Sequence, residues 1–173
     1  MDMHEHTLHW TVIYVASRQE KVVARRLGQL QIEHYLPLVT RIRIWSDRRK
    51  KVEMPLFNGY VFVRPAKHQY DLVLQQTGAV AYVRYNGKPA RVGDDEIETI
   101  RSLIACGYDL EATGIDATTL PGTQVRITQG PLRGFEGEIV HTGSGQQFII
   151  ALHSIEQNIR VKLPAEALEA IPS

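Results

Sequence analysis

A chain of 173 residues has room for one medium-sized domain or two small ones. Its composition, 43% hydrophobic and 23% charged, is that of an ordinary globular protein. No apolar run approaches the roughly 18 residues that a membrane-spanning helix needs, and residues 1–9 lack the apolar segment of a signal peptide. The single cysteine, Cys106, has no internal disulfide partner and suits a reducing compartment. We therefore expect a cytoplasmic protein that does not contact membranes.

The two halves of the chain carry opposite net charges, which the overall value of +1 conceals. Residues 1–106 hold 16 Lys and Arg against 11 Asp and Glu, a net charge of +5. Residues 107–173 hold 4 against 8, a net charge of −4. This asymmetry predicts two domains with different partners, of which the basic one could meet nucleic acid.

The chain begins with a polar segment that contains His4, His6 and His9. These histidines would allow a metal site, but no cysteine or carboxylate stands at a metal-ligand spacing beside them. We therefore interpret the segment as a disordered leader and expect neither a bound metal nor a cofactor.

A first strand is expected at 10–15, followed by a helix that ends near Leu30. Ser17 and Glu20 match a capping box at the start of this helix. Its expected buried stripe consists of Val23, Leu27 and Leu30. The other side of the helix is mostly cationic and is either a solvated face or a phosphate-binding surface. The candidate nucleic-acid-binding residues on that side are Arg18, Lys21, Arg25, Arg26 and Gln29.

A second strand is expected at 39–45, where Ile42 and Ile44 alternate with arginines in a half-buried pattern. A block of four consecutive cations follows, and such a block belongs to a hairpin tip or loop because it cannot be buried. It consists of Arg48, Arg49, Lys50 and Lys51. This basic arm either contacts DNA or RNA or serves only to solvate the tip.

The apolar run Tyr60–Val63 predicts a strand buried on both faces, in the middle of a sheet. Before it, Pro55 and Gly59 frame Leu56 and Phe57 in a loop whose aromatic ring is either in the core or offered to a partner. A short helix at 68–76, a strand at 79–85 that ends in an Asn-Gly turn, and a helix at 93–107 complete this half. The order predicts an α+β fold, a sandwich of helices on a mainly antiparallel sheet.

Hydrophobic periodicity fades at 108–120, which is expected to be a linker. The remaining segment, 121–173, alternates in four short strands separated by tight glycine turns and predicts a small β-barrel. The sequence contains no phosphate-binding glycine loop, no metalloprotease helix and no paired cysteines, so we do not expect an enzyme.

Three segments, in order, resemble the NusG family of transcription elongation factors. They are Trp10–Val15, Pro55–Val63 and Gly122–Val140, which has the glycine pattern of a KOW motif. In the second segment Asn58 stands where the family usually has the proline of Phe-Pro-Gly-Tyr. With its basic run Trp45–Lys51 followed by Pro55-Leu56-Phe57, the chain looks most like the specialised paralogues of the UpxY and RfaH type, which act on surface-polysaccharide operons.

The resemblance implies an NGN-like domain at 8–107 that binds RNA polymerase, the linker at 108–120, and a KOW β-barrel of SH3-like form at 121–173. The implied contacts with the clamp helices of the largest polymerase subunit are Trp10, Pro55, Leu56, Phe57 and Tyr60. Phe57 is the preferred one, since it precedes the strand, whereas Trp10 and Tyr60 could equally be core. The implied KOW residues are Gly130, Pro131, Arg133, Gly134 and Gly137.

The resemblance also implies a function without chemistry. The protein would bridge the polymerase cleft as a monomer, contact non-template or upstream DNA, and suppress pausing or termination by favouring the closed clamp. The KOW domain would recruit a small-subunit ribosomal protein or Rho, and its glycine turns favour a stable barrel. Two alternatives stay open: a general housekeeping NusG factor, and a KOW-containing protein that binds RNA or the ribosome.

Overall fold

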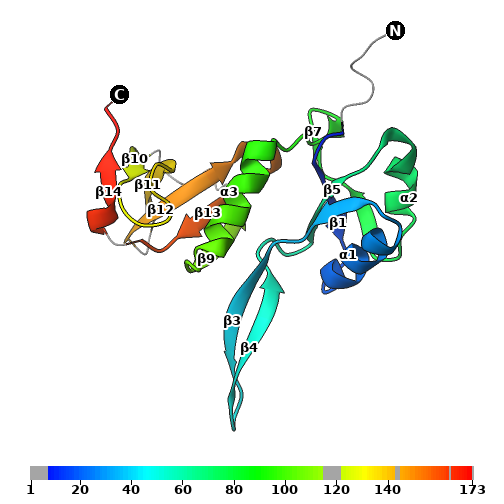
Figure 1. Ribbon diagram of the computed structural model, residues 1–173, viewed down its shortest axis with the longest axis horizontal. Helices are drawn as coiled ribbons and strands as arrows, with labels where there is room; N and C mark the ends of the chain where they lie inside the picture. Colours follow the sequence, from blue (N-terminus) through cyan, green and yellow to red (C-terminus); the bar gives the residue numbers. More distant parts are fainter. Residues whose placement is uncertain (1–7, 115–121, 143–144, 164, 173) are drawn as a thin grey trace. The chain divides into compact units, whose positions relative to one another are not determined.

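The computed structural model describes residues 8–114, 122–142, 145–163 and 165–172 of the chain (Figure 1). The chain forms two compact units, Met1–Ile97 and Glu98–Ser173. Both contain mainly antiparallel sheet, and helices lie beside the sheet in the first, so the predicted α+β class is confirmed at the level of a mixed α/β fold. Within the described ranges, no helix combines the length and the apolar content needed to cross a membrane.

The first unit is built on a four-stranded antiparallel sheet with the strand order β2-β5-β1-β6. Its strands are β1 (Thr11–Val15), β2 (Glu33–Tyr35), β5 (Tyr60–Arg64) and β6 (Ala79–Tyr82). Strand β5 lies between β2 and β1, and its three central residues are fully buried. The prediction of a central strand buried on both faces is therefore confirmed.

One face of this sheet packs against helices α1 (Glu20–Gln29) and α2 (Tyr70–Leu74), the latter preceded by a 3₁₀ turn η1 (Lys67–Gln69). The shared core contains Ile13 and Val15 of β1, Val23 and Leu27 of α1, Val61 and Val63 of β5, Val73 of α2 and Tyr82 of β6. Leu30, which was expected to join it, is exposed, and so is Leu74 of α2. Ile32 is buried in place of Leu30, because the chain turns back toward the sheet after α1.

Helix α1 starts later than the capping-box prediction required. Its N-cap is Gln19, which makes no side-chain cap hydrogen bond, and Arg18 has a left-handed backbone with φ 64°. The Glu20 carboxylate is instead committed to tertiary structure, because its Oε1 accepts a hydrogen bond from the Gly59 amide at 2.9 Å. The predicted capping box is therefore wrong.

Two hairpins accompany the sheet of the first unit without joining it. The longer one pairs β3 (Leu38–Ile44) with β4 (Arg49–Pro55), and the shorter one pairs β7 (Arg84–Tyr85) with β8 (Lys88–Pro89). In the shorter hairpin Asn86 and Gly87 have φ values of 51° and 77°, the conformation that an Asn-Gly hairpin turn requires. That turn is confirmed.

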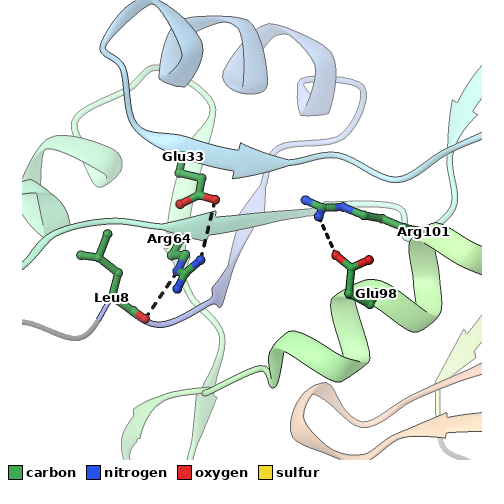
Figure 2. Close-up of polar contacts among 5 residues, drawn as sticks. All are labelled: Leu8, Glu33, Arg64, Glu98 and Arg101. Carbon is green, nitrogen blue, oxygen red and sulfur yellow. Dashed lines mark hydrogen bonds and ion pairs between the residues drawn. The ribbon is translucent and has the colours of Figure 1, made fainter.

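Helix α3 (Asp94–Ala105) forms where a helix was expected after Gly93. Ile97, Ile100 and Leu103 are buried along one stripe, and Gly107 follows the helix with φ 74°. On its exposed side Glu98 and Arg101 form an i,i+3 ion pair of 2.8 Å (Figure 2).

The second unit contains a six-stranded antiparallel sheet with the order β14-β10-β11-β12-β13-β9. Its strands are β9 (Leu110–Gly114), β10 (Thr123–Ile127), β11 (Glu136–Thr142), β12 (Gly145–Leu152), β13 (Gln157–Val161) and β14 (Leu168–Ala170), with 3₁₀ turns η2 (His153–Ile155) and η3 (Ala165–Ala167).

Strand β9 corrects part of the predicted linker at 108–120. Leu110 is buried and pairs with Val161, and the pairing continues to Gly114 opposite Gln157. The segment lacks apolar periodicity, so its strand is stabilised by a partner about fifty positions away, which the local sequence does not reveal. Residues 115–120 of the predicted linker lie outside the described residues, as do His4 and His6 of the leader.

Candidate functional site

The face of the four-stranded sheet opposite the helices carries a continuous row of aromatic side chains. The register places Tyr14 opposite Tyr60, and Phe62 opposite Tyr35, on this face. Neighbouring ring centroids are 5.2 Å apart for Tyr14–Tyr60, 6.5 Å for Tyr60–Phe57, 5.7 Å for Phe57–Phe62 and 6.3 Å for Phe62–Tyr35. These five residues are called the aromatic row below.

The row runs from a buried interior to an exposed end. Phe57 is 2% exposed and Phe62 is fully buried, whereas Tyr60 is half-buried and Tyr14 is 42% exposed. Tyr14 is the single exposed residue of β1, whose other four residues are buried. An exposed tyrosine supported by a second ring has the rigid, amphipathic character of residues that dominate protein interfaces.

Three of the residues predicted to contact a partner are instead part of the core. Trp10, Leu56 and Phe57 are each 5% exposed or less, so the expectation that Phe57 is offered directly to a partner is wrong. Trp10 lies beneath the Arg64 guanidinium, whose Cζ is 6.0 Å from the ring centroid. Arg64 is held in place by the Leu8 carbonyl at 3.4 Å and by Glu33 at 3.9 Å (Figure 2).

The loop before β5 explains why the Phe57 ring turns inward. The Leu56 amide donates to the Pro37 carbonyl at 2.9 Å, and the Gly59 carbonyl accepts from the Val15 amide at 2.8 Å. Together with the bond from the Gly59 amide to Glu20, these contacts hold the loop against the sheet at both ends. Gly59 has φ 80°, a conformation that favours glycine. The loop is therefore a preorganised support for the neighbouring half-buried Pro55 and Tyr60.

A cavity of about 570 Å³ adjoins this loop. It is lined by Asn58 and Gly59 of the loop, by Met54 and Pro55 of β4, and by Arg18 and Lys21 near the start of α1. Glu20 and Glu53 line it too, so its walls combine apolar atoms with two cationic and two acidic residues. Sequence reasoning identified Pro55 here but missed Met54, as it missed Tyr14, because both depend on which strand faces meet.

The predicted cationic side of α1 is only partly available. Lys21, Arg25 and Gln29 are exposed and fall on one stripe at i, i+4 and i+8. Arg26 is half-buried and donates to the Thr77 carbonyl at 3.0 Å, which commits it to structure. Lys21 donates to the Glu53 carbonyl at 2.7 Å, and Arg18 lies in the exposed turn before the helix.

The basic arm lies at the tip end of the β3–β4 hairpin, as one of the two alternatives predicted, and most of it is strand. Arg49, Lys50 and Lys51 belong to β4, and the tip consists only of Ser46 and Asp47 between Trp45 and Arg48. The prediction that Ile42 and Ile44 are half-buried is wrong: both are strongly exposed, because β3 pairs only with β4.

The KOW-type residues form the connection between β10 and β11 in the second unit. Gly130 and Gly134 have φ values of 78° and 94°, Pro131 and Arg133 are exposed, and Leu132 between them is fully buried. Gly137 lies in β11, where a Cβ atom would come within 2.5 Å of the Ile149 carbonyl oxygen. The glycines thus shape the sheet. Across the residues that the structure describes, no group of three or more His, Cys, Asp and Glu could hold a metal ion.

Comparisons with known proteins give a consistent result. The family model described as "Transcription termination factor nusG" matches residues 8–101, which is more than half of the chain. A solved structure that describes domain interaction in Thermotoga maritima NusG is similar to this chain, with 20% sequence identity and a TM-score of 0.54. The match covers 96% of this chain and 98% of that chain. A crystal structure of the MjSpt4:Spt5 complex is 17% identical over 95% of this chain and 97% of that chain, but its TM-score of 0.30 carries no structural argument.

Proposed function

Since its family match makes this chain a member of the NusG family of transcription factors, we propose that it is an elongation and antitermination factor that binds RNA polymerase. The family is non-enzymatic, so the protein acts by binding and not by chemistry. We further propose that it works in the cytoplasm as a monomer, without a cofactor.

The proposed polymerase contact is the exposed end of the aromatic row together with the adjoining cavity. The observation that carries this proposal is Tyr14, which is 42% exposed on a strand that is otherwise buried and whose ring centroid lies 5.2 Å from that of Tyr60. A coiled-coil ridge, such as the clamp helices of the largest polymerase subunit, presents apolar side chains that fit a surface of this kind. Phe57 contributes from beneath through its ring contact with Tyr60, and Leu56 through the hydrogen bond that anchors the loop next to Pro55, whereas Trp10 is a core residue beside Arg64.

The test is the affinity of purified RNA polymerase for the Tyr14→Ala variant, with Tyr85→Ala as the matched control. Tyr85 is also an exposed tyrosine, 54% accessible, but it lies on the β7–β8 hairpin away from the aromatic row. Loss of an interface aromatic costs about 2 kcal/mol or more, so we expect Tyr14→Ala to weaken binding about 30-fold. Equal binding by both variants would refute this contact surface.

The mechanism we propose is a shift in population. A factor that binds the closed clamp better than the swivelled or open states stabilises elongation by the difference between those affinities. Lys21, Arg25 and Gln29 on α1, with Arg18 before it, are the residues proposed to approach upstream or non-template DNA, since phosphate contacts supply affinity without sequence preference.

For the second unit we propose a KOW β-barrel that recruits a small-subunit ribosomal protein or Rho. The antiparallel order of its six strands and the glycine-shaped turn at 130–134 support a β module without a fold switch. The −4 net charge of residues 107–173 argues against the alternative of an RNA-binding module, because phosphates repel acidic surfaces.

We propose an operon-specific role of the UpxY and RfaH type over a housekeeping one. Asn58, which lines the cavity, and the exposed basic arm are the features that support it. Mapping the occupancy of the tagged protein along the genome separates the two: enrichment over one or a few operons is expected, whereas coverage of most transcribed genes with strong Rho binding would favour the general factor.

A further inference from the structure

The β3–β4 hairpin is a separate ribbon that extends from the first unit. Its strands pair along their whole length, from Leu38 opposite Pro55 to Ile44 opposite Arg49, and neither pairs with the four-stranded sheet. Figure 1 shows the ribbon reaching away from the sheet to a narrow tip. The tip is closed by mutual hydrogen bonds between the backbones of Trp45 and Arg48, at 2.8 and 3.3 Å. Such a projection is stabilised mainly by its own pairing, so its side chains are available to a partner.

The hairpin carries most of the net positive charge of the first half of the chain. Residues 38–55 contain six Lys and Arg against two acids, a net charge of +4 of the +5 found in residues 1–106. Arg48, Arg49, Lys50 and Lys51 are exposed, and none of them makes an ion pair or hydrogen bond through its side chain with any residue that the structure describes. An unneutralised group of this density attracts a polyanion.

The tip is also apolar, which a purely solvating arm does not explain. Trp45 is 55% exposed, Ile42 is 62% exposed and Ile44 is 73% exposed. Directly opposite residues in an antiparallel pair share a face, so Trp45 lies beside Arg48 and Ile44 lies beside Arg49. Each exposed apolar side chain near the tip is therefore next to a cation.

We propose that this tip binds DNA that has unpaired bases, with Trp45 stacking on a base and the cations of β4 contacting the flanking phosphates. A stacking aromatic beside a cationic track is the combination that recognises single strands, because every base has a π-face and every step has a phosphate. In a fully paired duplex the base faces are covered by their neighbours, so Trp45 would gain nothing there. Ile44, on the other face of the ribbon, could serve the same purpose, since apolar side chains insert as wedges between unstacked bases. The choice of DNA over RNA rests on the proposed function, which places the protein on a transcribing polymerase.

The chain offers a direct optical test. It has two tryptophans, and Trp10 is only 4% exposed, so quenching of fluorescence by a ligand reports on Trp45. The full chain is titrated, without polymerase, with a DNA duplex that carries a single-stranded tail, with a blunt duplex of the same sequence, and with the same duplex carrying an RNA tail. We expect quenching by the DNA-tailed duplex and an affinity at least about tenfold higher than for the blunt duplex.

Variants separate the contribution of base stacking to DNA affinity from the contribution of phosphate contacts. Trp45→Ala is expected to lose the preference for the tailed duplex, and Trp45→Phe to keep part of it. The pair Arg49→Ala and Lys50→Ala is expected to weaken binding to all substrates and to lower the slope of log affinity against log salt by about 0.7 for each phosphate that is no longer neutralised. Tyr85→Ala, which removes an exposed aromatic from the other hairpin, is the matched control and should bind like the unchanged chain.

Equal affinity for tailed and blunt duplexes, or an unchanged preference in Trp45→Ala, would overturn the proposal. A preference for the RNA tail over the DNA tail would also overturn it. Failure here is distinguishable from failure of the proposed function, because no polymerase is present and Tyr14→Ala should leave DNA binding unchanged. Conversely, if Trp45→Ala and Tyr85→Ala both bind all DNA normally while only Trp45→Ala loses polymerase, the tip is a protein contact and the proposal is refuted.

Discussion

Replacement of Phe57 by alanine separates a core role from a contact role. Full burial of a phenyl ring contributes about 1.5–3 kcal/mol. The two ring contacts, at 5.7 Å to Phe62 and 6.5 Å to Tyr60, contribute about 0.5–1.5 kcal/mol each. The sum, about 2.5–6 kcal/mol, brackets the cost of about 3–5 kcal/mol that removal of a buried phenylalanine usually has. For a unit of this size each kcal/mol corresponds to about 4–8 °C, so we expect the thermal midpoint of the first unit to fall by about 20 °C.

The assay is thermal unfolding of the full chain, followed by circular dichroism, in parallel with polymerase binding measured well below the midpoint. At that temperature Phe57→Ala should bind more weakly only to the extent that Tyr60 has moved, whereas Tyr14→Ala should bind much more weakly while unfolding at nearly the unchanged temperature. A Phe57→Ala protein with unaltered stability and abolished polymerase binding would refute the reasoning, since it would mean that the ring leaves the core to meet its partner.

Substitutions at three further positions test contacts that stabilise the two units. Glu20→Ala should destabilise the first unit by about 1–3 kcal/mol, because it leaves the Gly59 amide without its hydrogen-bond acceptor. Glu20→Gln keeps an acceptor oxygen and should cost clearly less, and denaturant titration of both variants measures the difference. Gly137→Ala should cost about 1–3 kcal/mol by pressing on the carbonyl of β12, while Gly114→Ala, with open space at its Cβ position, should cost little in the same thermal assay. Leu132→Ala should lower the stability of the second unit by about 2–5 kcal/mol, and an unchanged midpoint would show that the 130–134 turn does not bury this side chain.

The parts of the fold that sequence predicted are those fixed by local chemistry. Tyr60–Val63 is apolar at every position, which only a central strand can accommodate, and β5 is that strand. Asn86-Gly87 supplies two residues that tolerate positive φ, and both adopt it. Helix α3, Asp94–Ala105, lies within the predicted range 93–107.

The parts that sequence could not predict depend on partners distant in the chain. Glu20 fits a capping box, but the Gly59 amide competes for its carboxylate across 39 positions. Leu110 stands in a polar segment and becomes a strand only because Val161 pairs with it. Ile42 and Ile44 alternate as if half-buried, yet the ribbon has no sheet beneath that would cover one face.

The exposed aromatic residue of the candidate site was mispredicted for a related reason. A strand motif rich in aromatic residues does not reveal which of the rings stays exposed, because that depends on how the preceding loop folds back. Here hydrogen bonds to Pro37, Val15 and Glu20 hold the loop over Phe57. The most exposed ring of the row is therefore that of Tyr14, which lies in a different strand. The motif therefore led to the aromatic row but not to Tyr14, the residue exposed at its edge.

Charge placement separates the binding surfaces of the first half of the chain. With +4 of its +5 net charge on residues 38–55, the rest of residues 1–106 is nearly neutral overall, and the α1 stripe is only a local excess. Long-range attraction to a polyanion therefore acts first at the hairpin and falls off within a Debye length of about 10 Å at moderate salt. The aromatic row lies on the sheet and not on the ribbon, so it depends on apolar contact that salt does not screen. Raising the salt concentration should accordingly weaken binding to DNA far more than binding to polymerase through Tyr14.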